Sequence, residues 1–260
     1  MAVSTGRTER ERTASLLPVR GWSELALVAL LYVGYSASRL LASDDVAPAR
    51  ERARDLLSLE SSWGLDVEQA VNRVFVDHDW LGVVSSYWYA TTHYVVTLAV
   101  LIWLYRRSRG QYLTARRAIV LASVLGLLCY LAMPTAPPRF VEGFTDVLRL
   151  HAEVGWWGGD ASAPKGLGGL TNELAAFPSL HAGWALWVAV VVQRAGVARP
   201  WRWLGWTYAA VTALVVVGTG NHWVLDVVGG WLLVLVAVAA TDVAEAAWSP
   251  GRRATATSGD

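Results

Sequence analysis

Six long apolar runs are the feature that most constrains the fold of this chain. They cover roughly residues 22–42, 81–105, 116–133, 179–196, 202–219 and 222–246. An α-helix rises ~1.5 Å per residue, so about 20 apolar residues cross the ~30 Å hydrocarbon core of a bilayer. Only 17% of the residues are charged, against the ~25% usual in soluble domains. The sequence therefore predicts an all-α integral membrane protein built as a bundle of six transmembrane helices.

Polar segments set the limits of the membrane domain. Residues 1–21 and 247–260 are polar tails, and residues 22–246 hold all six runs. The first run is longer than the apolar core of a signal peptide, so we interpret it as a retained span rather than a cleaved leader.

Two segments between the runs have patterns of their own. Within 43–79, Val67, Val71 and Phe75 recur at helical spacing among charged neighbours, which predicts an amphipathic helix on the outer membrane surface. The segment 134–178 is long for a loop and rich in glycine. We expect it to form a flexible cover over an active site on the outer face.

Arginine and lysine are divided unevenly between the two sides of this topology. With the N-terminus in the cytoplasm, 14 of them fall on the cytoplasmic side, five of these in a 106–117 loop, and seven on the outer side. The positive-inside rule then places both termini in the cytoplasm and the protein in the cell membrane. The formal net charge of +1 gives no bulk attraction to nucleic acid. The single cysteine, Cys129, excludes an intrachain disulfide and a Cys-x-x-Cys site.

Histidines begin two of the apolar runs. His222 opens the last run, and Asp226 follows four residues later, so in a helix the two side chains share a face. Alone, this pair fits a capped helix start as well as a catalytic pair. His181 opens the fourth run, which crosses the membrane in the same direction, so both histidines are expected at similar depth on the outer side. Ionisable groups in membrane spans are usually functional, and the second histidine therefore favours a site.

Helix starts of this kind bind anions, because their first N–H groups are unpaired and lie at the positive end of the helix dipole. Pro178 suits the first turn of the fourth run, and Asn221 or Thr219 is a candidate cap for the sixth. Two such starts side by side can hold a phosphate. Arg139 follows the third run and offers a guanidinium fork for the phosphate oxygens. Ser179 is either a cap or a phosphate donor, and we favour the donor.

A phosphate held there assigns the histidines different roles. His222, oriented by Asp226, is the candidate nucleophile that attacks phosphorus. His181 is the candidate acid that protonates the leaving oxygen, because an imidazole with a pKa near ~6.5 can do so close to neutral pH.

Three short motifs carry a resemblance to a known family. APPR (136–139), PSLH (178–181) and GNHWVLD (220–226) resemble the motifs of the type 2 phosphatidic acid phosphatase superfamily. Within it they look most like the inositol phosphorylceramide synthases and their bacterial relatives. The resemblance implies a six-helix membrane fold, a lipid phosphate or diphosphate as substrate, no metal or cofactor, and a phosphohistidine at His222.

The sequence departs from the phosphatase branch at the phosphate-binding positions. That branch has an arginine six residues before the histidine, where this chain has Val216, and the lysine of the first motif has no clear match. Candidates for the missing contacts are Arg139, then Arg39 at the outer end of the first run, with Asn221 beside the histidine. His93, in the second run, is either a residue that supports the site or contacts a headgroup, or a buried histidine bonded to a neighbouring helix.

Alternative functions stay open at this point. Either water or an alcohol such as inositol is the acceptor of the phosphoryl group. A related alternative is an inositol phosphotransferase that moves a phosphoinositol headgroup between lipids. A b-type haem protein with axial His181 and His222 or His93 is a rival from another class, although Asp226 one turn from His222 argues against it. A catalytically inactive lipid-binding relative is the third alternative.

Overall fold

The structure is a computed structural model that describes residues 45–157 and 172–247, with isolated positions between 22 and 36. The chain divides into two compact units, Met1–Ala37 and Ser38–Asp260, and the account below concerns the second. The two tails, most of the first apolar run and Arg39 lie outside the described residues.

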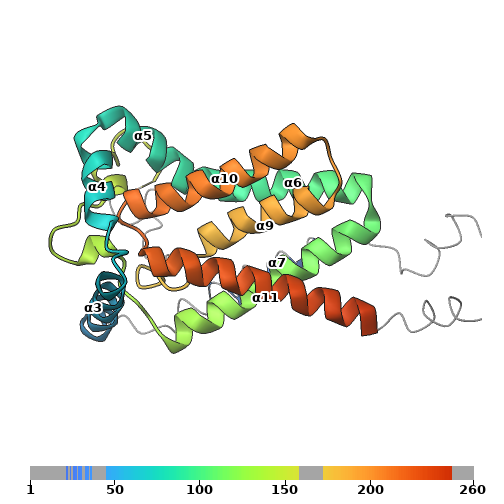
Figure 1. Cartoon of the computed structure of the whole chain (residues 1–260), viewed down its shortest axis with the longest axis horizontal. Coiled ribbons are helices and arrows are strands. Elements are labelled where there is room, and N and C mark those ends of the chain that lie inside the picture. The colour runs from blue at the N-terminus through green and yellow to red at the C-terminus, as the bar shows by residue number, and fades with distance from the viewer. Residues whose placement is uncertain are drawn as a thin grey trace, which may run out of the picture. The chain divides into compact units, whose positions relative to one another are not determined.

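Five long helices form a bundle. They are α6 (His93–Arg107), α7 (Arg109–Ala132), α9 (Leu180–Arg194), α10 (Arg199–Gly218) and α11 (Val224–Ala247). Helix α9 lies at the centre, packed against α10 and α11, and α11 also packs along α7 (Figure 1). Every element longer than four residues in the described part of the chain is a helix, which agrees with the predicted helical bundle.

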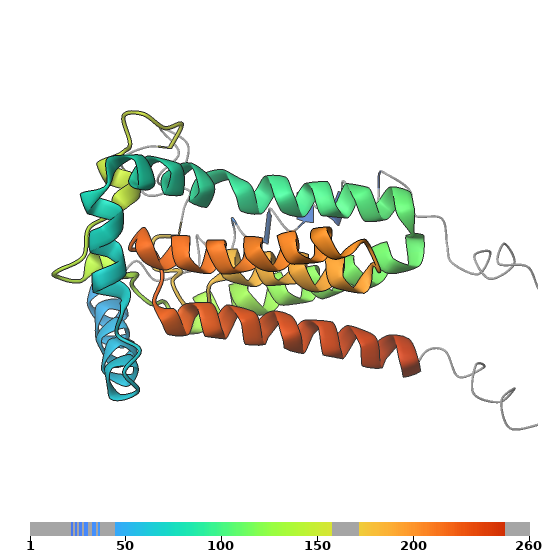
Figure 2. The same cartoon turned by 45° about the horizontal axis from the view of Figure 1, so that its top comes forward.

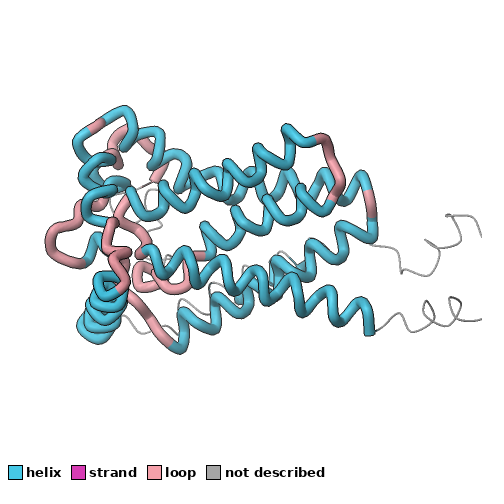
Figure 3. The backbone as a smooth tube through the Cα atoms, in the orientation of Figure 1, coloured by secondary structure: helices cyan, strands magenta, loops and turns pink. Residues whose placement is uncertain are grey.

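Three further helices gather at one end of this bundle. They are α3 (Val46–Ser62), α4 (Glu68–Asp77) and α5 (Asp79–Tyr87) (Figure 1). Helix α5 continues through a π-helical segment, η1 (Trp88–Thr92), directly into α6 (Figure 2). Most of the connecting loops lie at this same end, near the starts of α9 and α11 (Figure 3). The fold therefore collects irregular backbone where the two histidine motifs begin.

The boundaries of the second and third runs differ from the prediction. A loop over 106–117 was expected because of its five arginines, but only Ser108 separates α6 from α7. The Ser108 hydroxyl accepts the Gln111 N–H at 3.5 Å and caps α7. Arginine is a good helix former, so these basic residues continue the two helices instead of ending them.

Two of the helices, Arg109–Ala132 and Val224–Ala247, are long and apolar enough to cross a membrane by length and composition. The six-span topology, the placement of the termini and the orientation stay predictions.

The predicted amphipathic helix within 43–79 is two helices, α3 and α4, joined by a turn. The inner face of α4 carries Glu68, Asn72 and Phe75, which are all buried, while Val67 and Val74 are about half exposed. Glu68, one of the charged residues between the valines, thus lies on the inner face of α4. The reason is tertiary, because the Asn72 amide donates to the Thr145 and Gly218 carbonyls and the Glu68 carboxyl accepts the Val224 N–H.

Close contact between α9 and α11 depends on glycine at two positions. A Cβ at Gly230 would collide with the Ser179 carbonyl oxygen, and one at Gly183 would lie 3.0 Å from the Gly230 oxygen. The missing side chains let the two backbones touch where the histidine motifs begin.

We expect Gly230→Ala to destabilise the fold by roughly 3 kcal/mol, because the collision is with backbone that cannot rotate away. Chemical or thermal unfolding in detergent measures the loss. Gly110→Ala is the matched control, since a Cβ at that helical position meets no atom within 4 Å. Equal stability of the two variants would show that α9 and α11 can separate without cost.

Candidate active site

The turn between α10 and α11 places His222. Gly220 adopts a φ of 73°, and the amides of Asn221 and His222 both donate to the Val216 carbonyl, at 3.3 and 3.0 Å. His222 was expected in the first turn of a helix, but α11 begins two residues later, at Val224. The Asp226 carboxylate accepts the Trp223 N–H at 2.8 Å, so the helix is capped after His222 and the histidine stays in the turn.

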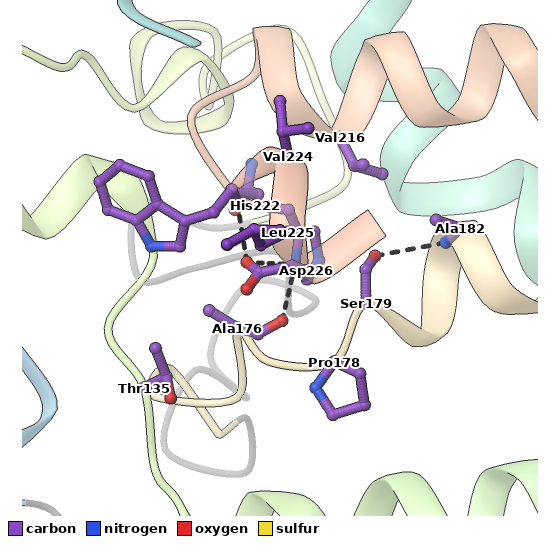
Figure 4. A network of polar contacts seen from close by, with 12 residues as sticks. Thr135, Ala176, Pro178, Ser179, Ala182, Val216, His222, Val224, Leu225 and Asp226 are labelled. Atoms are coloured by element: carbon purple, nitrogen blue, oxygen red, sulfur yellow. Dashed lines mark hydrogen bonds and ion pairs between the residues drawn. The ribbon is translucent and has the colours of Figure 1, made fainter. Parts of the chain in front are cut away.

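His222 and Asp226 nevertheless meet. His222 Nδ1 lies 3.4 Å from Asp226 Oδ2 and 2.9 Å from the Ala176 carbonyl oxygen, and both residues are buried (Figure 4). Both neighbours of Nδ1 are acceptors, so Nδ1 carries the proton of the neutral ring. Nε2 is buried, without a hydrogen-bond partner among the described residues, and holds the free lone pair.

His181 lies beside His222, as the common polarity of their helices predicted. The two ring centroids are 5.7 Å apart. Tyr89 stacks on His181 at 4.3 Å and 23°, and His93 meets it edge-on at 4.2 Å. Tyr89 lies within the π-helical segment η1 and His93 directly follows it, and π-helical turns are frequent at functional sites. The structure thus adds His93 to the histidine cluster, together with Tyr89, which the sequence analysis missed.

Ser179 serves as the cap of α9. It is fully buried, and its hydroxyl accepts the Ala182 N–H at 3.3 Å. Pro178 was expected in the first helical turn but precedes the cap, and its carbonyl accepts the Tyr130 hydroxyl at 2.8 Å. The backbone N–H of Ser179 donates to the Asp226 carbonyl at 2.8 Å. This bond ties the start of α9 directly to the acidic residue of α11.

Arg139 reaches the site through the residue next to His222. Its Nη1 donates to Asn221 Oδ1 at 2.5 Å, its backbone N–H donates to the Gly220 carbonyl at 2.9 Å, and its Nε lies 3.4 Å from the Asp146 carboxylate. The side chain is only 10% exposed. The guanidinium is therefore fixed against the His222 turn, where the sequence analysis expected a phosphate-binding arginine.

The two ends of the 134–178 segment form a wall of the site. Thr135 pairs with Ala175 in a parallel bridge, and the Ala176 N–H donates to the Thr135 carbonyl at 3.2 Å. Trp223 is fully buried, and its indole donates to the Ala136 carbonyl at 2.9 Å. This pairing holds the Ala176 carbonyl against His222. Residues 158–171, from the glycine-rich middle of the expected cover, lie outside the described residues.

The start of α11 is occupied by carboxyl groups of α3 and α4. Glu68 Oε1 accepts the Val224 N–H at 3.0 Å, and Glu60 Oε1 accepts the Leu225 N–H at 2.6 Å. The expectation that these amides bind phosphate was wrong, because fully buried carboxyl groups already take them. The expected caps Asn221 and Thr219 instead bond to each other at the end of α10.

No local pattern in the sequence marks Glu60 or Glu68 as part of this site, because their partners are backbone amides more than 150 residues away. One signal was present for α4. Glu68, Asn72 and Phe75 are spaced to share one helical face, which groups two polar residues with the aromatic that was expected to be buried.

Comparison with known proteins assigns the family. A family model described as the PAP2 superfamily matches residues 54–240, which is most of the chain and includes every residue of the site described above. No curated protein and no solved structure matches the chain. The match to the inositol phosphorylceramide synthase branch stays a resemblance. The chain therefore belongs to the PAP2 superfamily, whose members are phosphoric-ester hydrolases and phosphotransferases.

Proposed function

We propose that the protein is a membrane-embedded lipid phosphatase or phosphotransferase that works through a phosphohistidine on His222. The observation that carries the proposal is the pairing of the two histidines. One has a buried, unpartnered Nε2, and the other has its ring 5.7 Å away. A phosphorus atom between them can be attacked from one side while its leaving oxygen is protonated from the other.

The first half-reaction starts at His222 Nε2. Its lone pair forms a bond to phosphorus while the bond from phosphorus to the leaving oxygen breaks, and His181 gives that oxygen a proton. The Ala176 carbonyl and the Asp226 carboxylate hold the Nδ1 proton and stabilise the positive charge that the ring acquires. Arg139, fixed by Asn221, is proposed to bind a phosphate oxygen.

The second half-reaction reverses the roles. An acceptor hydroxyl gives its proton to His181 and attacks phosphorus, and the bond to His222 breaks. Water as acceptor yields inorganic phosphate, and inositol as acceptor yields inositol phosphate. If His222 carries a phosphoinositol group instead, a lipid alcohol as acceptor yields a new phosphoinositol lipid. The chemistry of His181 and His222 is the same in all these routes, so the outcomes differ only in the group that His222 carries and in which acceptor enters.

The surface of the bundle supports a membrane location for this reaction. Large apolar side chains from several long helices are more than half exposed, and soluble monomers rarely expose apolar patches of that size. These side chains include Val95, Leu98, Leu128, Leu214, Leu232 and Val236. A lipid phosphate can thus reach the site while its acyl chains stay in the bilayer, and we propose the outer leaflet of the cell membrane.

The test is phosphate release from a panel of lipid phosphates and diphosphates by detergent-purified protein, with and without inositol. Release identifies a phosphatase and its lipid class. Inositol phosphate that forms only with added inositol identifies a transferase. Failure of both reactions across the panel would contradict the proposal and favour the inactive lipid-binding alternative. A visible spectrum of the same sample checks the haem alternative, and we expect no Soret band.

Replacement of Asp226 by asparagine tests how the Nδ1 proton is held. We expect Asp226→Asn to lower kcat by about 10- to 100-fold, less than the ~10,000-fold known for a relay with one acceptor. The Ala176 carbonyl still accepts the Nδ1 proton at 2.9 Å, so the variant loses the negative charge but keeps the tautomer. Steady-state kinetics measure the loss. A loss as large as that of His222→Ala would mean that the Ala176 contact does not orient the ring.

A further inference from the structure

Three consecutive amides at the start of α11 are each taken by a carboxyl group. Trp223 N–H donates to Asp226 at 2.8 Å, Val224 N–H to Glu68 at 3.0 Å, and Leu225 N–H to Glu60 at 2.6 Å. All three acids are fully buried. They come from three helices, α11, α4 and α3, and they surround the short segment that links His222 to Asp226. The positions of His222 and Asp226 therefore depend on Glu60 of α3 and Glu68 of α4.

In each of the two glutamates only one carboxyl oxygen is hydrogen-bonded within the described part of the chain. In each, Oε1 accepts a backbone amide, while Oε2 is buried without a hydrogen-bond partner among the described residues. The carboxyl groups of Glu60 and Glu68 are close enough to interact with each other. Two ionised carboxylates in such a buried position repel, whereas one proton between them turns the repulsion into a hydrogen bond.

We propose that Glu60 and Glu68 are positioning residues for phosphoryl transfer, and that they hold the start of α11 as a carboxylic acid paired with a carboxylate. Glu60 is the protonated member and donates through Oε2 to Glu68. Glu68 keeps its negative charge at the positive end of the α11 dipole, where an anion is stabilised. The pair contacts neither phosphate nor the reacting atoms and acts only through the segment that carries His222 and Asp226.

Electrostatics support the assignment of the proton to Glu60. Burial raises the pKa of Glu60 from 4.5 to about 8, and the carboxyl groups of Glu68 and Asp226 add to the rise, although the Leu225 N–H opposes it. These two acids, one on α4 and one on α11, are the titratable groups that face Glu60. Above pH 8 the proton of Glu60 is lost, two negative charges then repel each other beside one helix start, and the start of α11 is expected to loosen.

The pH profile of the wild-type protein and of Glu60→Gln tests the pair. Glutamine copies the protonated acid, because its oxygen can accept the Leu225 N–H and its amide can donate to Glu68. We expect kcat of the wild type to fall as the pH rises through about 8, with KM changing little. Glu60→Gln is expected to keep kcat within about threefold at pH 7 and to lose this alkaline fall. An unchanged alkaline fall in Glu60→Gln would overturn the proposal.

Two further variants separate positioning from simple stability. Glu60→Ala removes the acceptor of the Leu225 N–H and is expected to lower kcat at least about tenfold with KM within about threefold. Glu51→Gln, an exposed position on the same helix, is the matched control and keeps the wild-type profile. Wild-type kcat in Glu60→Ala would contradict a positioning role.

These kinetic readouts rest on the proposed function, so a readout without substrate is also needed. The pKa of Glu60 is raised in the folded state, so between its ordinary value of 4.5 and about 8 the unfolded chain releases a proton that the folded protein keeps. The stability that protonated Glu60 gives to the wild type is therefore lost as the pH rises through this window. Glu60→Gln has no proton to lose at this position and keeps its stability. The Tm of Glu60→Gln minus that of the wild type is expected to grow from pH 5 to pH 8.5. A difference that does not change with pH would refute the shared proton, even if no substrate is turned over.

Discussion

His222→Ala is expected to lower turnover by at least about 10,000-fold, the scale seen when a covalent nucleophile is removed. Alanine has no group that can form the bond to phosphorus, so the variant lacks the lone pair that the buried Nε2 of His222 supplies. The fold should survive, because the backbone amide of residue 222 still donates to the Val216 carbonyl. Single-turnover assays with a radiolabelled lipid phosphate measure the rate, and the wild-type protein should retain acid-labile label that the variant lacks.

The matched control for this prediction is His78→Ala. His78 is an exposed histidine before α5, outside the cluster formed by His93, His181 and His222. It should turn over substrate at the wild-type rate. Substantial activity in His222→Ala, or label retained by that variant, would remove His222 from the nucleophile role and leave the family assignment intact.

His181→Ala is expected to lower the rate by roughly 100- to 1,000-fold for lipid phosphates whose leaving group is an alkyl alcohol, the usual range for loss of a general acid. Such an alcohol is a poor leaving group unless it receives a proton as the bond breaks. Nitrophenolate leaves without that help, so the variant should release it from nitrophenyl phosphate in a single turnover at nearly the wild-type rate, although the later attack of water still needs His181 as the base. The ratio of the two rates, measured on one protein preparation, is the readout.

This ratio also serves as the internal control for folding. The ring of His181 stacks on Tyr89 and contacts His93, so its removal can lower the fraction of active protein. Such a loss lowers both rates by the same factor and leaves the ratio unchanged. An equal loss with both leaving groups would therefore assign His181 a packing role and require another acid, for which His93 is the nearest histidine.

Elements with a local signal were predicted well from the sequence. Apolar runs and their polar ends located α7, α9, α10 and α11 to within several residues, because helix formation depends on side chains a few residues apart. The largest error lay at α7, which begins at Arg109 and not near 116, since arginines at a helix end do not stop the helix. The pairing of His181 with His222 was also predicted, because two helices of one polarity bring their starts to the same end of a bundle.

The hydrogen bonds between side chains and backbone groups were not predicted from the sequence. The proton on His222 Nδ1 is held by the carbonyl of Ala176, and the start of α11 is held by Glu60 and Glu68. Every residue except proline offers the same N–H and C=O groups, so no residue type at position 176, 224 or 225 reveals that a partner from a distant segment will bond there.

The sequence by itself thus determined the helical class, the order of the motifs and the candidate residues of the site, because these depend on residue type and local spacing. Only the tertiary structure decided that His222 lies in a turn before α11, that Arg139 is bound to Asn221, and that two buried glutamates occupy the amides expected to hold phosphate. These features depend on which distant backbone groups are left unpaired when the helices pack, and packing brings Glu60 and Glu68 to the open end of α11.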